Sequence, residues 1–340
     1  MDLTIIIPTK NRLFFLERLL NYYKNSKYKG HLIIIDSSET NIFSEQKKLI
    51  NSYTNLSAKH VYSKYTPLHA TKEYVDLIKT NYVTFSGDDD YHHISGLNSC
   101  INFLDENKKI SSARGKAYLF ELNKLDNEIQ TIYDYDSYNF LDSNAVKRFK
   151  KFMQHPRSIT QNVWKTSIFK KSFNQLLEYE KIYLCPDRYF YDEILLTSLL
   201  LVNGKIKIID ETQFIMTLNS RRLKDRNKWQ KLDMNMIDKS IDYTAIKISE
   251  VIKINDKSNA TISLKDEIKS NLKNFIYNKY VPAVKKDNHL TIRKLIIYIS
   301  KKIEIYNFLK LILRKKNKNI NNNLSIRKEC KEIINSISGN

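Results

Sequence analysis

The chain has 340 residues, of which 42% are hydrophobic, and it carries a formal net charge of +20. This composition is typical of a folded globular protein, and the length allows one large domain with an appendage, or two domains. The three cysteines lie far apart without C-x-x-C spacing, which argues against a zinc cage or a disulfide framework and fits a reducing cytoplasm. The N-terminal apolar run is too short for a signal peptide, and no uncharged stretch approaches the ~18 residues that span a bilayer.

Strands and helices are expected to alternate over the first 85 residues. Leu3 to Ile7 is an apolar, β-branched run without alternation, as in a parallel strand covered on both faces, and Pro8 is expected to stop it. Apolar residues at spacings of three and four predict the helices. The further elements are expected as a helix from residue 13, a strand at 31–36, a helix at 44–52, a strand at 59–63, a helix at 67–79 and a strand at 82–85. This alternation predicts an α/β fold with a mostly parallel sheet.

The last of these strands leads into the sequence S-G-D-D-D-Y. Asp88, Asp89 and Asp90 are adjacent like charges, which repel one another unless a cation compensates them. Hard divalent ions such as Mg²⁺ and Mn²⁺ bind carboxylate oxygens and bridge to phosphates. The pattern therefore favours a metal–phosphate site, and the alternative is a solvated acidic turn.

Two other polar groups follow strands of the same sheet. Residues 9–12 come after the first strand, and Asp36 ends the second. In parallel sheets ligands bind beyond the carboxyl ends of the strands, where these groups and the aspartates are expected to meet. Neither G-x-G-x-x-G nor G-x-x-x-x-G-K-[ST] occurs, which argues against a dinucleotide-binding fingerprint and against a P-loop NTPase.

The segments T-I-I-I-P-T-K-N-R, I-I-I-D-S-S and Y-V-T-F-S-G-D-D-D-Y, in this order, resemble family 2-type glycosyltransferases of the GT-A fold, whose fourth strand leads into an acidic D-x-D motif. The resemblance covers roughly residues 1–220 and implies a GT-A nucleotide-diphospho-sugar transferase fold, which is Rossmann-like. Two registers of the motif stay open. Asp89 and Asp90 match the later two aspartates of the family's common L-D-A-D-D form, or Asp88 to Asp90 is itself the D-x-D.

The resemblance also implies roles for individual residues. A divalent Mn²⁺ or Mg²⁺ would be held by Asp89 and Asp90. The nucleotide-sugar donor would be bound by Thr9, Arg12, Asp36, Lys72, Asp88 and Asp89.

A downstream segment, Y-D-E-I-L-L-T-S-L-L-L-V-N-G-K-I-K-I-I-D-E, is similar to the family's helix that carries a catalytic aspartate. Asp192 matches that aspartate, at the start of an expected helix at 192–202, and would accept the proton of the acceptor hydroxyl as a general base. Glu193 and Asp187 are the alternative bases. Arg221 and Arg222 fall where the family has a loop that closes on the donor, although a plain basic loop is the alternative.

The positive charge is concentrated in the last hundred residues, which contain 21 Lys and Arg against 9 Asp and Glu, a net +12. Within them, the stretch Thr291 to Lys318 combines apolar residues at helical spacing with many basic side chains, as in helices that lie in a lipid interface. We therefore expect it to dock on an anionic membrane surface. The alternative is that its apolar face packs against the catalytic domain or a second subunit, the latter giving a homo-oligomer.

Taken together, these patterns predict a GT-A domain at 1–225 and a basic, mainly helical extension at 226–340. The expected activity is inverting, metal-dependent transfer of a sugar from a nucleotide-sugar to a hydroxyl of a surface glycan or lipid-linked acceptor. Lipopolysaccharide or capsule assembly, in the cytoplasm or on the inner face of the cell membrane, is the expected setting. One rival is a non-catalytic GT-A scaffold. The other, a nucleic-acid-binding protein, is less expected because the charge lies in a tail without a nucleic-acid motif.

Overall fold

The computed structural model describes residues 1–65, 67–122, 129–135, 137–154, 158–177, 194–218, 234–256, 262–279 and 324–338. The strands within these ranges are β1 Leu3–Thr9, β2 His31–Asp36, β3 Ser57–Tyr62, β4 Tyr82–Phe85, β5 Tyr91–His92, β6 Ser112–Leu122, β7 Ile129–Asp134, β8 Val163–Lys165 and β9 Ile206–Leu218. The helices are α1 Leu13–Asn25, α2 Thr40–Ser52, α3 Pro67–Tyr74, η1 Val75–Leu77, α4 Ile94–Glu106, α5 Ala145–Gln154, α6 Thr166–Leu177, α7 Leu196–Asn203, α9 Met234–Asp256, α10 Ile262–Lys279, α14 Leu324–Glu329 and α15 Lys331–Ser338.

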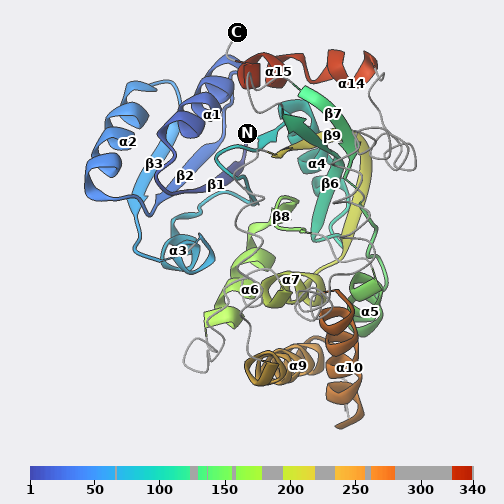
Figure 1. Cartoon of the computed structure of the whole chain (residues 1–340). Helices are drawn as coiled ribbons and strands as arrows, with labels where there is room; N and C mark the ends of the chain where they lie inside the picture. Colours follow the sequence, from blue (N-terminus) through green and yellow to red (C-terminus); the bar gives the residue numbers. More distant parts are fainter. Residues whose placement is uncertain are drawn as a thin grey trace, which may run out of the picture.

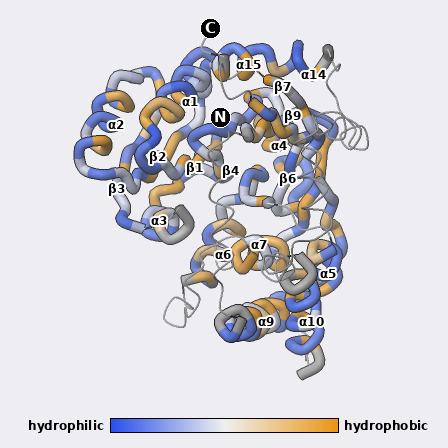
Figure 2. The backbone as a smooth tube through the Cα atoms, viewed as in Figure 1, coloured by the Kyte–Doolittle hydropathy of each residue, from blue (hydrophilic) through white to orange (hydrophobic). Residues whose placement is uncertain are grey.

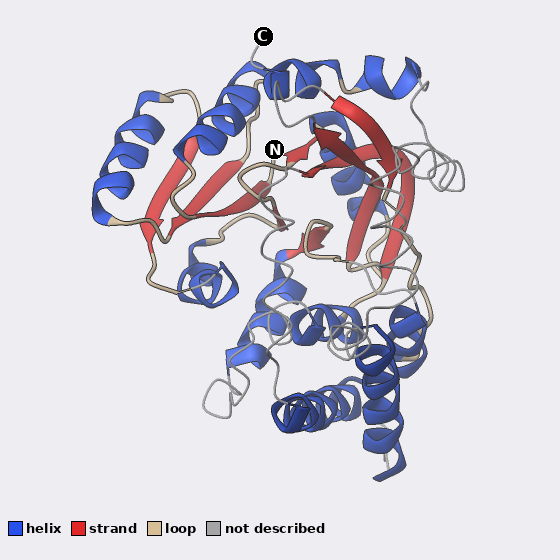
Figure 3. Ribbon diagram, viewed as in Figure 1, coloured by secondary structure: helices blue, strands red, loops and turns tan. Residues whose placement is uncertain are grey.

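The described strands form one sheet in the order β3-β2-β1-β4-β8-β6-β9-β5, with β7 paired to β6 (Figure 3). β1 is parallel to both β2 and β4, and β2 is parallel to β3. β8 is antiparallel to β4 and β6, whereas β6 and β9 are parallel. The predicted α/β fold with a mostly parallel sheet is confirmed, and the carboxyl ends of β1, β2 and β4 meet at one edge.

The prediction that Pro8 stops the first strand is wrong. β1 continues to Thr9, with Pro8 opposite Ile35 and Thr9 opposite Asp36 of β2. The pairing of β1 with β4 has already ended at Ile6, whose carbonyl accepts the amide of Ser86. Because alternate residues of a strand bond to opposite neighbours, the missing N–H of Pro8 faces the side where the ladder is over.

Two predicted helix boundaries also differ. α2 begins at Thr40 rather than near Ser44, and α3 ends at Tyr74 with a 3₁₀ turn to Leu77 instead of running to Lys79. In a 3₁₀ turn residues three apart point the same way. This allows Val75 and Ile78, which are 3% and 1% exposed, to enter the same core.

The sheet is covered on both faces (Figure 1). One core contains alternate residues of β1 and β2 together with α1, α2, α4 and α15, and its members include Leu3, Ile5, Leu16, Ile34 and Leu97. The other core contains the opposite residues of the same strands together with α3, α5, α6, α7, α9 and α10, and its members include Ile6, Ile33, Phe169, Leu199 and Ile248. Figure 2 shows α7 as almost wholly hydrophobic, and its residues Leu196 to Val202 are all buried. Apolar residues in β1 and β2 therefore do not alternate with polar ones, because both faces of the sheet are buried.

The described helices beyond residue 225 share these two cores. α9 and α10 pack with α5 and α7 below the sheet, and α15 packs on α1 at the top (Figure 1). Arg18 of α1 donates from Nε to the carbonyl of Ser336 at 3.3 Å, and the Ser336 hydroxyl donates to the carbonyl of Arg18 at 3.1 Å. The last described helix is thus tied to the first. Over the described ranges, no helix has both the length and the apolar character needed to cross a membrane. The stretch 291–318 lies outside the described residues.

Candidate active site

The three aspartates that follow β4 form a buried, acidic loop at the carboxyl edge of the sheet. We call Asp88, Asp89 and Asp90 the acid loop; their exposed fractions are 2%, 2% and 3%. The turn that contains these residues is closed by the amide of Asp90, which donates to the carbonyl of Gly87 at 3.2 Å. A solvated acidic turn is therefore not what the structure shows, and the buried negative charge requires compensation.

Arg12 supplies a cation to the acid loop. Its Nη1 lies 2.6 Å from Asp88 Oδ1, and its Nη2 lies 2.8 Å from Asp89 Oδ2. Thr9 donates its hydroxyl to Asp88 Oδ2 at 2.8 Å, and the Arg12 guanidinium stacks 4.2 Å from the ring centroid of Phe15. Residues 9–12, which we call the first loop, and the acid loop are thus joined by charge-assisted hydrogen bonds. Arg12 and Asp88 are 76 residues apart in sequence. The Arg12 side chain stays 30% exposed, so it is open to a ligand from solvent.

The third aspartate is held by β9. The amide of Thr217 donates to Asp90 Oδ1 at 3.1 Å, and the Thr217 hydroxyl donates to the backbone carbonyl of Asp89 at 2.6 Å. Thr217 was not predicted from the sequence, because nothing around it marks a residue that contacts a loop 127 positions earlier.

Two carboxylate oxygens of the acid loop lie close to Gly87. A Cβ placed on Gly87 would lie 2.7 Å from Asp90 Oδ2 and 3.3 Å from Asp89 Oδ1. A side chain at this position would therefore crowd both carboxylates. This donor set fits a hard divalent cation that takes its other ligands from phosphate and water. No group of three or more His, Cys, Asp and Glu that could hold a metal occurs in the described part of the chain.

Asp36 sits beside the first loop but is fully buried. Its Oδ1 accepts the amide of Ser38 at 2.8 Å, and its Oδ2 accepts Nε2 of His60 at 3.0 Å. The His60 ring stacks on Phe43 with centroids 4.4 Å apart. The Ser38 hydroxyl in turn accepts the amide of Asn11, so Asp36 shapes the turn that faces the first loop. His60 was missed from the sequence because nothing in its strand, S-A-K-H-V-Y, indicates a contact with Asp36.

The other predicted site residues are placed only in part. Lys72 lies in the last turn of α3 and is partly buried. Arg221 and Arg222 lie outside the described residues, as do the candidate bases Asp187, Asp192 and Glu193.

His92 is a structural residue. It is fully buried, its Nε2 donates to the carbonyl of Phe85 at 2.7 Å, and its Nδ1 accepts Nε2 of Gln213 at 2.7 Å. Burial, with a smaller effect of the nearby Arg114 charge, lowers the pKa of His92 from 6.5 to about 4. The neutral imidazole thus links β4, β5 and β9 behind the acid loop.

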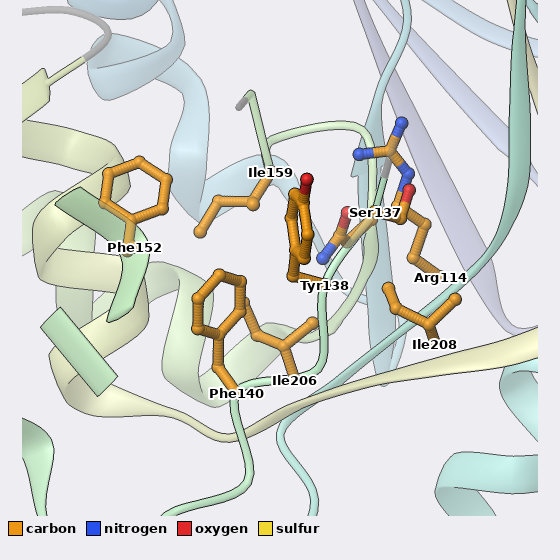
Figure 4. Close-up of a pocket in the computed structure, with 9 residues that line it drawn as sticks. Arg114, Ser137, Tyr138, Phe140, Phe152, Ile159, Ile206 and Ile208 are labelled. Carbon is orange, nitrogen blue, oxygen red and sulfur yellow. The ribbon is translucent and has the colours of Figure 1, made fainter. Parts of the chain in front are cut away.

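A small cavity lies between Arg114 of β6, Phe152 of α5 and the start of β9 (Figure 4). Figure 4 shows Tyr138, Phe140 and Ile159 around it, with Arg114 at its border. Its volume of about 10 Å³ is of the order of one water molecule. The cavity is therefore too small to hold a sugar ring.

No protein-family model matches the chain, and no curated protein matches it. Solved structures do match. S. aureus TarS 1–349 in complex with UDP-GlcNAc has a TM-score of 0.55 at 14% identity, over 87% of this chain and 78% of that one. The same protein in complex with UDP has a TM-score of 0.52 at 15% identity, over 88% and 78%. At this identity the likeness establishes the fold alone. The chain has the GT-A fold, as the sequence predicted.

Proposed function

We propose that this chain is a glycosyltransferase that moves a sugar from a nucleotide-sugar donor to a hydroxyl group of an acceptor. One observation carries the proposal: Arg12 bridges two buried aspartates where the carboxyl ends of β1 and β4 meet in a GT-A sheet. Ligands of such sheets bind at this edge. The shared fold with S. aureus TarS, solved with UDP-GlcNAc, supports the choice of donor class.

The residues at this edge suit a diphosphate leaving group. Arg12 is partly exposed and presents a planar, always charged donor, so it would contact the diphosphate oxygens. Thr9 and Asp88 would fix the position of Arg12 through the contacts they already make. Asp89 and Asp90 would hold a divalent cation, Mn²⁺ or Mg²⁺, which when bound neutralises charge that develops on the leaving group.

The acceptor hydroxyl must lose its proton as it attacks the sugar. We assign this role to Asp192, with Glu193 and Asp187 as alternatives, on the resemblance of the segment before α7 to the family helix. A single displacement with a carboxylate base inverts the anomeric centre, so an inverting reaction is part of the proposal. Lys72, Asp36 and the arginines 221 and 222 are proposed donor contacts, Asp36 through the turn that it shapes.

The setting of the reaction is proposed on sequence grounds. Residues 1–225 would form the catalytic domain and 226–340 a helical extension, with the stretch 291–318 docking on an anionic membrane surface. A glycan or lipid-linked acceptor, as in lipopolysaccharide or capsule assembly, would be presented at the inner face of the membrane. The membrane role is tested by sedimentation of the full chain with anionic vesicles at low salt. Failure to sediment would withdraw this part and leave the transferase proposal standing.

The transferase proposal is tested by measuring release of nucleotide from a panel of nucleotide-sugars with Mn²⁺. Asp89→Asn and Asp90→Asn should remove most turnover while the far-ultraviolet circular dichroism stays unchanged. Asp210→Asn is the matched control, because its carboxylate is 91% exposed and pairs only with Lys116 among the described contacts of its side chain. Equal turnover in wild type and in both acid-loop variants, or full turnover in EDTA, would contradict the proposed site.

The base is tested separately. Loss of a general base costs about 10² to 10⁴ in rate, so Asp192→Asn should lower turnover far more than it weakens donor binding. Turnover near that of wild type would transfer the assignment to Glu193 or Asp187, each tested by its own amide variant.

A further inference from the structure

A second cavity lies at the amino edge of the sheet, opposite the acid loop. It borders the start of β4, the end of α4, the end of β8 and the first turn of α6, and its volume is about 650 Å³. Because β4 runs from this edge to the acid loop, the cavity is separate from the candidate active site. We call it the basal cavity. The residues that line it include Lys79, Asp105, Lys108, Lys165, Thr166 and Lys170.

The basal cavity gathers four ammonium groups around one carboxylate. That carboxylate, Asp105, accepts the hydroxyl of Tyr82 at 2.7 Å and lies 3.5 Å from Lys108 Nζ. Lys170 Nζ is 3.9 Å from Asp76, whose side chain is 95% exposed, so this contact is weak in water. The positive charge of the cavity therefore exceeds the negative charge at its wall.

Two of these lysines lie close to each other. Lys165 Nζ donates to the backbone carbonyl of Lys108 at 2.8 Å, which brings two lysine residues together at the wall. Burial and the Lys108 charge lower the pKa of Lys165. A bound anion would relieve this repulsion.

The first turn of α6 adds to the positive potential of the cavity. The helix begins at Thr166, which lines the cavity, and has 12 residues, so its N-terminus carries a partial positive charge. The Thr166 amide already donates to the carbonyl of Asn81 at 2.9 Å, and the Thr166 hydroxyl oxygen is buried away from solvent. The contribution of this turn is therefore the helix dipole and not a hydrogen bond from Thr166.

We propose that the basal cavity binds a ligand with two or more phosphate-type oxyanions. Lysine ammonium groups and the partial positive charge of a helix N-terminus attract phosphate oxygens in proteins. Four lysines spread around about 650 Å³ suit a diphosphate or triphosphate better than one small anion. The ligand is either an inorganic polyphosphate or a nucleoside diphosphate. The assignment does not depend on the proposed transferase activity.

The proposal is tested by titrating the full chain with tripolyphosphate, and in parallel with UDP, in EDTA and low salt by calorimetry. Lys165→Gln together with Lys170→Gln should raise the dissociation constant by about 10-fold or more. Tighter binding of UDP than of tripolyphosphate, lost in the double lysine variant, would indicate the nucleotide as the source of the phosphates.

Two controls separate this site from the candidate active site. Lys47→Gln with Lys48→Gln removes two exposed lysines of α2 and should leave binding unchanged. Asp90→Asn should abolish nucleotide release without changing tripolyphosphate affinity, whereas the double lysine variant should keep nucleotide release. The absence of binding to wild type at millimolar tripolyphosphate would overturn the proposal, as would wild-type affinity in the double lysine variant.

Discussion

Replacing Arg12 by alanine should destabilise the fold as well as the site. Arg12 makes two charge-assisted hydrogen bonds, to Asp88 and Asp89, whose side chains are 3% and 1% exposed. Removing one partner of a buried ion pair costs about 3–5 kcal/mol because the other charge is left uncompensated. The 30% exposure of the Arg12 side chain admits water and reduces this cost, so we expect a loss of about 2–4 kcal/mol.

The loss is measured by urea unfolding at pH 7.5, with and without Mg²⁺. Arg12→Lys is the matched control: it keeps the charge but cannot bridge two carboxylates, so it should lie between wild type and Arg12→Ala. Millimolar Mg²⁺ should restore part of the stability of Arg12→Ala, because a divalent cation replaces the missing charge. A loss below about 0.5 kcal/mol, or identical curves for both variants, would refute the reading that Arg12 compensates the acid loop.

Three further predictions concern Gly87, His92 and α15. Gly87→Ala would push apart an oxygen of Asp89 and an oxygen of Asp90, which lie 3.3 Å and 2.7 Å from the new Cβ. The Mn²⁺ affinity measured by fluorescence quenching should therefore fall by about 10-fold or more while the protein stays folded. Unchanged affinity would contradict the metal assignment. His92 has a lowered pKa in the fold, so the unfolded chain binds more protons between pH 6.5 and about 4 and stability should fall as the pH is lowered through this window. Urea unfolding should show about 2 kcal/mol less stability at pH 5 than at pH 7.5 from this group, and His92→Gln should lose that difference; an equal slope in the variant would rule out His92 as its source. Ile333→Ala should lower the free energy of unfolding by about 2–4 kcal/mol because Ile333 is fully buried between α15 and α1. Ile254 is 71% exposed, so Ile254→Ala should lower it by less than about 0.5 kcal/mol. Equal losses in the two variants would mean that α15 is not docked.

The parallel half of the sheet could be predicted because its determinants are local. Leu3–Ile7 and residues 32–35 are apolar runs that only a strand buried on both faces explains, and each is followed by a polar group at the same edge. Helix ends were less predictable. The 3₁₀ turn after α3 depends on the packing of Val75 and Ile78 under the sheet, which sequence spacing does not encode.

The candidate site divides in the same way. The meeting of Thr9, Arg12 and the acid loop was expected because parallel strands place their carboxyl ends together, although the bridging of two aspartates by Arg12 was not. The contacts of Thr217 with the acid loop join positions more than a hundred residues apart. They arise from the register of β9, which no local pattern specifies.

The proposed transferase requires that a nucleoside diphosphate bind at the acid loop and Arg12. The most direct test is calorimetric titration of the full chain with UDP, GDP, CDP and dTDP in the presence of Mn²⁺, repeated for Arg12→Ala and Asp89→Asn. We predict that at least one nucleotide binds to wild type and that each variant weakens its binding by about 10-fold or more, since each removes a charged contact to phosphate or metal. Absence of binding for the whole panel, or equal affinity in wild type and both variants, would contradict the account.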